Sequence, residues 1–167
     1  MNTVTIFKET GVTEGACGKI LDTEEYSTVI KRVHRHLKHK AKCLNAEKQC
    51  QMQIWAHELL VPANGFSILY SPRAWYQPGD KHQYYMDRVD CSHQLDPFSA
   101  SATTVAELKL FYEKAKEVGI FPCDYELYVQ PDGRIALIDF DKFGSWTEKD
   151  EVVFPWGLIW TKPLYPW

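Results

Sequence analysis

The 167-residue sequence predicts an α+β fold in a single domain. Short runs of β-branched and aromatic residues, which favour strands, surround two longer segments whose apolar residues recur at helical spacing. No Gly/Ser-rich linker and no internal repeat divides the chain. Its composition, 45% apolar and 25% charged, excludes a disordered, collagen-like or coiled-coil protein and is typical of one soluble domain with its own core.

The first half is expected to contain strands on both sides of one helix. Residues 42–60 contain neither Gly nor Pro, carry apolar residues at helical spacing and end just before Pro62, which cannot continue a helix. They therefore predict a helix. The strands expected around it are 4–8, 17–21, 26–33, 66–70 and 83–89.

The second half is expected to contain a helix followed by a hairpin. Residues 104–118 place their large apolar side chains on one side and are followed by Gly119, which is typical of a helix end. Residues 126–130 and 134–140 predict two strands joined by the turn sequence PDG. The tail from Trp146 has no clear pattern, and we expect its tryptophans to pack on the C-terminal half; docking of a partner is the alternative.

Charge and cysteine content narrow the classes of protein. With 19 basic and 22 acidic residues, the net charge of -3 gives no overall attraction to nucleic acid or to an acidic membrane. Five cysteines without a CxxC pair are expected to be reduced thiols. The start MNTVTIFKETG lacks the apolar run of a secretory signal, and no window reaches the roughly 20 apolar residues of a membrane span. We therefore expect an intracellular protein, cytoplasmic or nuclear.

Paired carboxylates at the end of a strand are the strongest chemical signal. The apolar run 135–138 leads directly into Asp139, and Asp141 follows two residues later. Residues i and i+2 of a strand share a face, so both carboxylates are expected to point the same way. Two close anions coexist best around a divalent cation such as Mg²⁺. The alternative is an acidic turn that Lys142 neutralises.

Three further charged residues, Asp124, Lys31 and Glu47, are candidates for a site together with these acids. Asp124, on a loop between a helix and the hairpin, suits a base that orients a hydroxyl, although a turn former or cap is the alternative. Lys31 lies within an apolar strand and Glu47 within an apolar helix stripe. A buried charge needs a partner, so a Lys31–Glu47 pair is expected unless both side chains reach water.

The order of these signals resembles the protein-kinase-like superfamily, including aminoglycoside and lipopolysaccharide kinases, over about residues 11–144. The string LIDFD, which contains Asp139, is the most specific likeness; its last residue, Asp141 in place of Gly, resembles the small-molecule and lipopolysaccharide kinases more than most protein kinases. The resemblance implies a minimal kinase-like fold, with an antiparallel-sheet N-lobe and hinge over 1–90 and a strongly reduced C-lobe over 91–167. It also implies ATP and Mg²⁺ as cofactors and transfer of the γ-phosphoryl group to a hydroxyl, more readily of a protein Ser/Thr than of a small molecule.

The resemblance also implies roles for individual residues. Asp124 matches the catalytic-loop aspartate, and Asp139 matches the metal-binding aspartate. Lys31 matches the lysine that contacts the nucleotide phosphates, and Glu47 its helix partner. The remaining nucleotide contacts are Gly15 and Gly18 from a glycine-rich loop, and Asp87 and Val89 from a hinge that follows Met86 at the gatekeeper position.

Departures from the family pattern keep two other functions open. The sequence Pro122-Cys123-Asp124 lacks the usual histidine, and Val129 stands where a metal-binding Asn is expected, so Glu126 or Asp141 would have to replace it. A pseudokinase that acts as a binding module is therefore one alternative. A nucleic-acid-binding protein that uses the basic segment 31–42 is a second, less favoured one, because a solvated connector explains that segment as well.

Overall fold

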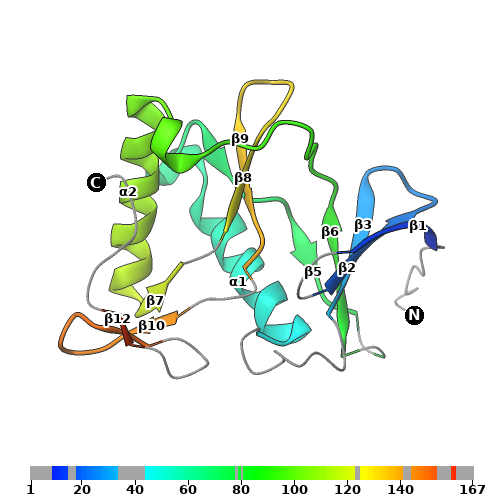
Figure 1. The fold of residues 1–167 in the computed structure, drawn as a ribbon, viewed down its shortest axis with the longest axis horizontal. Helices are drawn as coiled ribbons and strands as arrows, with labels where there is room; N and C mark the ends of the chain where they lie inside the picture. Colours follow the sequence, from blue (N-terminus) through cyan, green and yellow to red (C-terminus); the bar gives the residue numbers. More distant parts are fainter. Residues whose placement is uncertain are drawn as a thin grey trace.

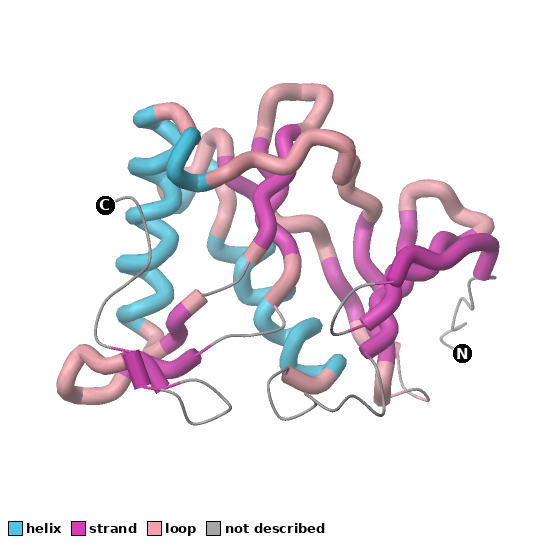
Figure 2. The backbone as a smooth tube through the Cα atoms, viewed as in Figure 1, coloured by secondary structure: helices cyan, strands magenta, loops and turns pink. Residues whose placement is uncertain are grey.

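The computed structural model confirms the α+β class and describes residues 9–14, 18–33, 44–77, 79, 81–122, 125–140, 144–153 and 159–160. A five-stranded antiparallel sheet lies at one end of the molecule, a long helix and a four-stranded sheet lie at the other, and a three-stranded sheet lies between these ends (Figures 1 and 2). A second helix runs between them. None of the helices in this described part is long and apolar enough to cross a membrane.

The five-stranded sheet is built from the N-terminal half. Its strands, in spatial order, are β1 (Glu9–Glu14), β2 (Gly18–Thr23), β3 (Thr28–Val33), β6 (Gln83–Asp87) and β5 (Ala74–Trp75). All four pairings are antiparallel. The strands expected at 17–21, 26–33 and 83–89 are thus confirmed within a few residues, whereas the one expected at 4–8 lies outside the described residues.

Helix α1 (Ala46–Leu59) covers one face of this sheet. Its apolar contacts come from Ala46 and Cys50, which join a buried cluster with Val29, Tyr84 and Met86 of the strands. The helix begins where the Asn45 side chain accepts a hydrogen bond from the Lys48 N–H, a standard N-cap. The helix expected at 42–60 is therefore confirmed over most of its length; residues 42 and 43 lie outside the described ranges.

The second half contains helix α2 (Ala102–Glu117) and a mixed sheet in the order β4 (Leu69–Tyr70), β9 (Ile135–Ile138), β8 (Glu126–Val129). The expected β8–β9 hairpin is present, and Gly133 adopts the positive φ of 85° that its turn requires. Buried Leu108 and Phe111 of α2 pack with Leu127 and Leu137 of the hairpin in the largest core cluster.

A third small sheet occupies part of the tail that the sequence left unassigned. Its strands are β12 (Ile159–Trp160), β11 (Val152–Val153), β10 (Gly144–Trp146) and β7 (Ile120–Phe121), in that order. Trp146 packs edge-on against the Phe121 ring at 5.1 Å between centroids. Trp146 therefore packs on the C-terminal half as expected, whereas Trp156 and Trp167 lie outside the described residues.

Residues 66–68, expected as part of a strand, do not form one in the structure. The segment instead follows a 3-10 turn, η2 (Pro62–Asn64), and only β4 is extended; a second 3-10 turn, η3 (Pro97–Ser99), precedes α2. The carboxylate of Glu107 accepts the N–H groups of Ser67, Ile68 and Leu69 at 2.8–3.2 Å. A side chain from α2 thus takes the donors that a ladder of strand hydrogen bonds would use.

The Asn45 cap predicts a measurable loss of stability when it is removed. Replacing Asn45 by Ala is expected to cost about 1 kcal/mol of unfolding free energy, because one N–H at the start of α1 loses its acceptor. Urea unfolding of the two proteins measures the difference. Asn45→Asp keeps an acceptor and should match the parent, whereas equal stability of parent and Asn45→Ala would contradict this role.

Candidate active site

The structure brings together two of the predicted site residues, which stand 108 positions apart. Lys31 Nζ donates a hydrogen bond to Asp139 Oδ1 at 2.6 Å, and the two charged groups form an ion pair. Lys31 is only 8% exposed, while the Asp139 side chain keeps 30% of its surface accessible. A buried ammonium thus meets a carboxylate that still reaches solvent.

Strand register explains why Lys31 points into the molecule. Lys31 pairs with Ile20 of β2 and with Tyr84 of β6, and it shares a sheet face with Val29, because alternate residues of a strand point the same way. Val29 and Tyr84 are buried in the cluster that α1 covers, and Ile20 packs against it. Lys31 is therefore a charge on the covered face of the sheet, as the apolar run around it predicted.

The chain turn after β9 brings Asp139 to this lysine. Ile138, the last residue of β9, packs against the apolar cluster of the N-terminal sheet, so the strand end lies beside that sheet. Asp139 itself has φ 73°, a left-handed conformation that is uncommon for a residue with a side chain. Such backbone strain is concentrated at functional sites, and here it accompanies the turn at which the carboxylate meets Lys31.

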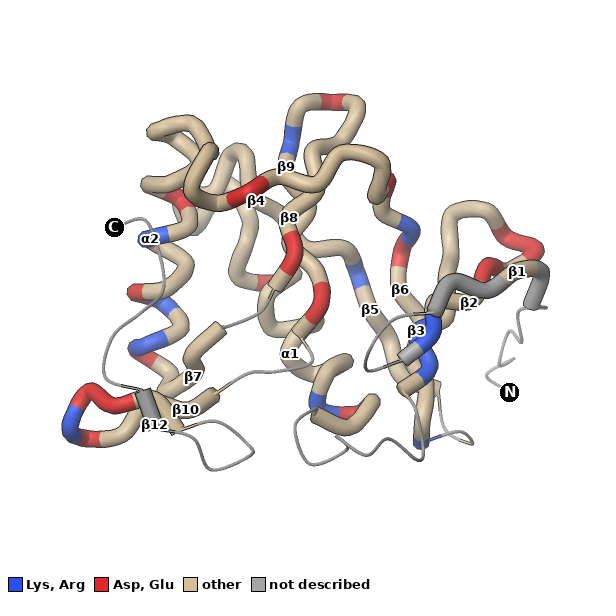
Figure 3. Tube along the Cα trace, viewed as in Figure 1, with Lys and Arg blue, Asp and Glu red and all other residues tan. Residues whose placement is uncertain are grey.

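A second carboxylate, Glu126, lies across the hairpin from this turn. Glu126 of β8 stands in register with Ile138, the residue directly before Asp139. Figure 3 shows acidic segments, in red, close to β8. The Tyr128 hydroxyl donates to Glu126 Oε2 at 2.7 Å. Burial, this hydrogen bond and the negative charges of Glu126 and Asp139 together raise the pKa of Tyr128, so both carboxylates lie within electrostatic range of one phenol. The phenol stays protonated and holds the Glu126 carboxylate in place.

The carboxylates of Glu126 and Asp139 are ligands of the kind that a hard cation prefers, but two carboxylates alone do not complete a metal site. Glu126 and Asp139 supply oxygen ligands, and Mg²⁺ is usually held by one or two carboxylates plus the phosphates of a substrate. Across the described ranges, no group of three or more His, Cys, Asp or Glu side chains is placed to hold a metal ion. Asp141 and Asp124 lie outside those ranges. Two carboxylates are the number of protein ligands that such a metal usually takes when phosphate ligands are also bound.

The predicted Lys31–Glu47 pair is wrong. Glu47 is exposed in the first turn of α1, and no ion pair joins it to Lys31 among the described residues. The buried residues of α1 are Ala46, Gln49, Cys50, Gln53 and Ala56. They form a stripe at i, i+3, i+4, i+7 and i+10, which turns position 47 toward solvent.

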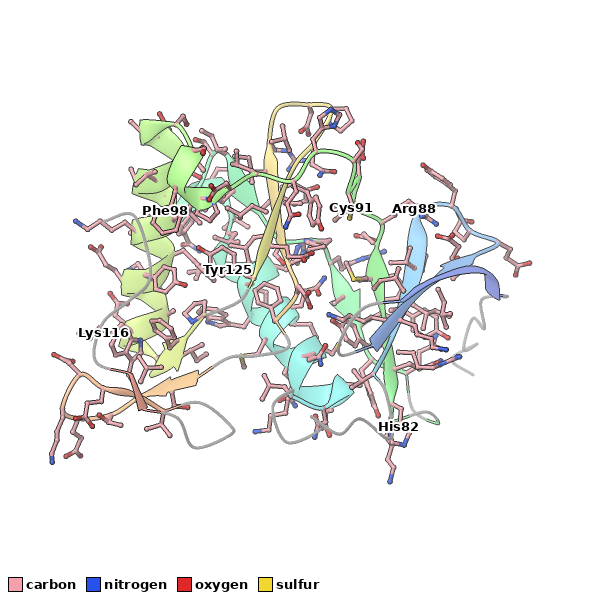
Figure 4. The ribbon with its side chains drawn as sticks, in the orientation of Figure 1. His82, Arg88, Cys91, Phe98, Lys116 and Tyr125 are labelled. Carbon is pink, nitrogen blue, oxygen red and sulfur yellow. The ribbon has the colours of Figure 1, made fainter. Side chains whose placement is uncertain are left out.

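The segment in which the sequence predicts a hinge follows β6 and leads from the five-stranded sheet to the second half. Met86 is buried, and Asp87 ends β6 with its N–H bonded to the Arg73 carbonyl at 2.9 Å. Val89 is also buried, and its carbonyl accepts from the Cys91 thiol. Arg88, which sequence reasoning missed, forms an ion pair with Asp22 at 2.8 Å and, like Cys91, lies on this connecting segment (Figure 4).

Of the other predicted positions, the structure describes only some. Gly15 lies outside the described residues, and of the glycine-rich loop only Gly18 is placed, in backbone register with Val33. In the basic segment 31–42, Lys31 is buried and paired with Asp139, and Arg32 donates to Gln83, so neither cation is a fully exposed contact for a nucleic-acid backbone. Residues 34–42 fall outside the described ranges.

Sequence reasoning also missed polar residues whose burial depends on the tertiary fold. Gln49, Gln53 and Glu107 are each at most 6% exposed. The only local signal for them was position: Gln49 and Gln53 stand at i+3 and i+7 from Ala46, and Glu107 adjoins the apolar Leu108.

No protein-family model matches the chain and no curated protein sequence is significantly similar to it, so the site is defined by the geometry described above.

Proposed function

We propose that the chain is an ATP- and Mg²⁺-dependent phosphotransferase that moves the γ-phosphoryl group to a hydroxyl acceptor. The observation that carries this proposal is the 2.6 Å contact between Lys31 and Asp139. These are the two residues to which the kinase resemblance assigns the nucleotide phosphates and the metal. A minimal protein-kinase-like fold is part of the proposal.

The topology supports this fold. Three antiparallel strands are followed by a helix and by two further strands that complete the sheet in the order β1-β2-β3-β6-β5. A connecting segment, a helix and the β8–β9 hairpin then lead to Asp139. This order agrees with the N-lobe, hinge and metal-binding strand that the resemblance implies. Among the described residues, the elements after the hinge segment are η3, α2, the β8–β9 hairpin and the strands β7, β10, β11 and β12, in line with a reduced C-lobe.

In this proposal, different charged residues bind the phosphates and the metal of Mg·ATP. Lys31 would contact phosphate oxygens of the nucleotide, and Asp139 with Glu126 would hold the metal. When bound, Mg²⁺ neutralises charge on the β- and γ-phosphates. Lys31 and Asp139 also keep each other in position before the nucleotide arrives, since each is the other's ion-pair partner. The adenine would lie against the backbone of Asp87 and Val89, beside buried Met86.

Asp124 is the residue that we propose for the acceptor. Its carboxylate would orient the hydroxyl and take its proton as the hydroxyl oxygen bonds to the γ-phosphorus. The bond from that phosphorus to the β–γ bridging oxygen breaks, and ADP leaves with the bonding electron pair. Catalysis of this kind consists mainly of positioning and charge neutralisation. A protein Ser/Thr is the preferred acceptor because the elements described after the hinge segment supply few walls for a metabolite.

A nucleotide-binding module without catalysis is the second candidate. Val129, at the position where the family pattern has a metal-binding Asn, lies in β8 and carries no ligand atom. The loop before Asp124 also lacks the usual histidine. Such a module would keep the Lys31 contact with nucleotide but would not transfer the phosphoryl group.

Binding of Mg·ATP is the first test. At a ligand concentration a hundredfold above the dissociation constant, a site in the folded state adds about 2.7 kcal/mol of stability, so the melting temperature should rise by several degrees. Lys31→Met is expected to abolish this rise, because the phosphates lose their cation. Differential scanning calorimetry with and without Mg·ATP measures both proteins.

Lys48→Met is the matched control, since Lys48 is an exposed lysine in the first turn of α1. It should show the same rise as the parent. Transfer of label from γ-labelled ATP then separates the two candidates: a melting shift with transfer supports the phosphotransferase, and a shift without transfer supports the binding module. Absence of any shift in the parent would contradict nucleotide binding.

A further inference from the structure

The connecting segment, residues 88–95, leads from the end of β6 toward the β8–β9 hairpin (Figure 1). In the proposed function, on which this inference rests, the backbone at the start of this segment would contact adenine, and the acids Glu126 and Asp139 on and directly after the hairpin would hold the metal. Mg·ATP can use both contacts at once only if the segment and the hairpin stand at the separation that the nucleotide spans.

Arg88 fixes the start of the connecting segment to the five-stranded sheet. Its backbone N–H donates to the Ser27 carbonyl at 2.8 Å, and its side chain forms the ion pair with Asp22 at 2.8 Å. Its Nε also donates to the Tyr26 carbonyl, and its guanidinium lies over the Tyr26 ring at 4.6 Å. These contacts hold Arg88 against β2 and the turn that follows it.

Gln130 fixes the same segment to the hairpin, two residues further along. Gln130 directly follows β8, and its Oε1 accepts the Asp90 N–H at 3.1 Å while its Nε2 donates to the Asp90 carbonyl at 2.9 Å. One amide side chain therefore binds both backbone groups of one residue, as a paired strand would. The Nε2 also donates to the Tyr128 carbonyl at 3.1 Å, which orients the amide.

The side chain of Gln130 extends a pairing that begins further along the segment. There, the Val129 N–H donates to the His93 carbonyl at 2.9 Å. The backbone N–H of Gln130 donates instead to the Arg134 carbonyl at 2.8 Å, so it is used within the hairpin. The side chain therefore supplies the partner for Asp90 that the backbone of Gln130 does not.

The two anchors enclose Val89, which the proposed function places against adenine. Val89 is buried, and its carbonyl accepts from the Cys91 thiol at 3.6 Å. A residue whose neighbours on both sides are held in place loses little conformational freedom when a ligand binds to it. Such preorganisation strengthens binding, because less ordering is needed at the moment of association.

We propose that Gln130 is a positioning residue for the nucleotide: by holding Asp90, it keeps the connecting segment at the distance from Glu126 and Asp139 that Mg·ATP spans. Without Gln130, each half of the site would still bind its own part of the ligand. The second contact, however, would form at a lower effective concentration. Mg·ATP, which uses both halves, would lose affinity, whereas a ligand that uses one half would not.

Binding of the whole nucleotide and of its parts tests the proposal. Gln130→Met removes the amide and keeps the length of the side chain. Its affinity for Mg·ATP is expected to fall about fivefold, the equivalent of about one net hydrogen bond, while adenosine alone and Mg·tripolyphosphate alone should bind as they do to the parent. Titration calorimetry of the parent and the variant measures all three ligands.

Gln94→Met is the matched control, because Gln94 is an exposed glutamine of the same segment that meets β8 through its backbone. It should leave all three affinities unchanged. Gln130→Glu keeps an acceptor for the Asp90 N–H but loses the donor to the carbonyl, so its affinity for Mg·ATP should lie between those of the parent and Gln130→Met. The proposal is overturned if Gln130→Met binds Mg·ATP as tightly as the parent, or if it loses affinity for all three ligands alike, as a merely structural role predicts.

Hydrogen exchange without any ligand separates this inference from the proposed function. Exchange of the Asp90 amide, followed by NMR, is expected to be about fivefold faster in Gln130→Met and unchanged in Gln94→Met, because only the first loses the acceptor. A parent protein without affinity for Mg·ATP would end the proposed function and the positioning role with it. A parent that binds Mg·ATP, together with unchanged Asp90 exchange in Gln130→Met, would overturn this inference alone.

Discussion

Replacing Asp139 by Asn is expected to lower the rate of phosphoryl transfer by about a hundredfold to a thousandfold, the range found when one strong electrostatic contact is removed from an active site. Two effects contribute. In the proposed site the metal would lose a carboxylate ligand, and Lys31 would lose the ion pair that holds it at 2.6 Å. Initial rates with γ-labelled ATP and saturating Mg²⁺ measure the loss, normalised to folded protein by unfolding curves.

Asp132→Asn is the control for this prediction. Asp132 lies at the tip of the same β8–β9 hairpin, where it is exposed and pairs with Arg134 at 2.8 Å. It carries the same substitution but stands away from Lys31, so its rate should equal that of the parent. Equal rates for the parent and Asp139→Asn would exclude Asp139 from metal binding and would favour a non-catalytic module if nucleotide still binds.

Replacing Glu107 by Ala is expected to destabilise the fold by about 3 kcal/mol or more, the largest stability effect that the structure predicts. The 6% exposed carboxylate accepts hydrogen bonds from three consecutive backbone N–H groups and from the Ser67 hydroxyl at 2.9 Å. Without it, the buried N–H of Leu69 and the part-buried donors of Ser67 and Ile68 lose their acceptor. Chemical unfolding measures the change.

The same carboxylate predicts a pH dependence. Burial by itself would raise the pKa of Glu107, but the hydrogen bonds from Leu69, Ser67 and Ile68 lower it below its ordinary value of 4.5. A group whose pKa is depressed in the folded state stabilises the fold above its unfolded pKa. This stability should be lost as the pH falls from about 4.5 through the lower folded value.

Glu113→Ala is the control for Glu107, because Glu113 is an exposed acid of the same helix. It should leave stability within about 0.5 kcal/mol of the parent and keep the acid-dependent loss. A Glu107→Ala protein as stable as the parent, or one with the same acid profile, would contradict the anchoring role of this carboxylate.

Most regular elements followed from local spacing. The apolar periodicity of 104–118 anticipated α2, and the turn sequence PDG anticipated the β8–β9 hairpin, because both signals depend on residues close together in the chain. The short strand β5 was missed, since its two residues are extended only through pairing with β6. Residues 66–68 were assigned to a strand because the sequence does not reveal that Glu107, about forty positions later, binds the N–H groups of Ser67 and Ile68.

For the candidate site, too, the sequence identified some residues and misassigned others. Lys31 within an apolar strand and Asp139 at a strand end were recognisable from neighbours a few residues away. The choice of Glu47 as the lysine's partner used the same periodicity but an incorrect rotation of the helix about its axis. A shift of one position, about 100°, separates an exposed residue from a buried one.

What the sequence determined by itself is the α+β class, the main helices and strands, and Lys31 as a charge whose apolar surroundings required a partner. Only the tertiary structure decided who that partner is: Asp139 contacts Lys31, whereas Glu47 faces solvent. The physical reason is the separation along the chain over which each signal acts. Periodicity reports how side chains are spaced around one element, whereas a contact across 108 residues depends on how that element is rotated and on where the chain returns to meet it.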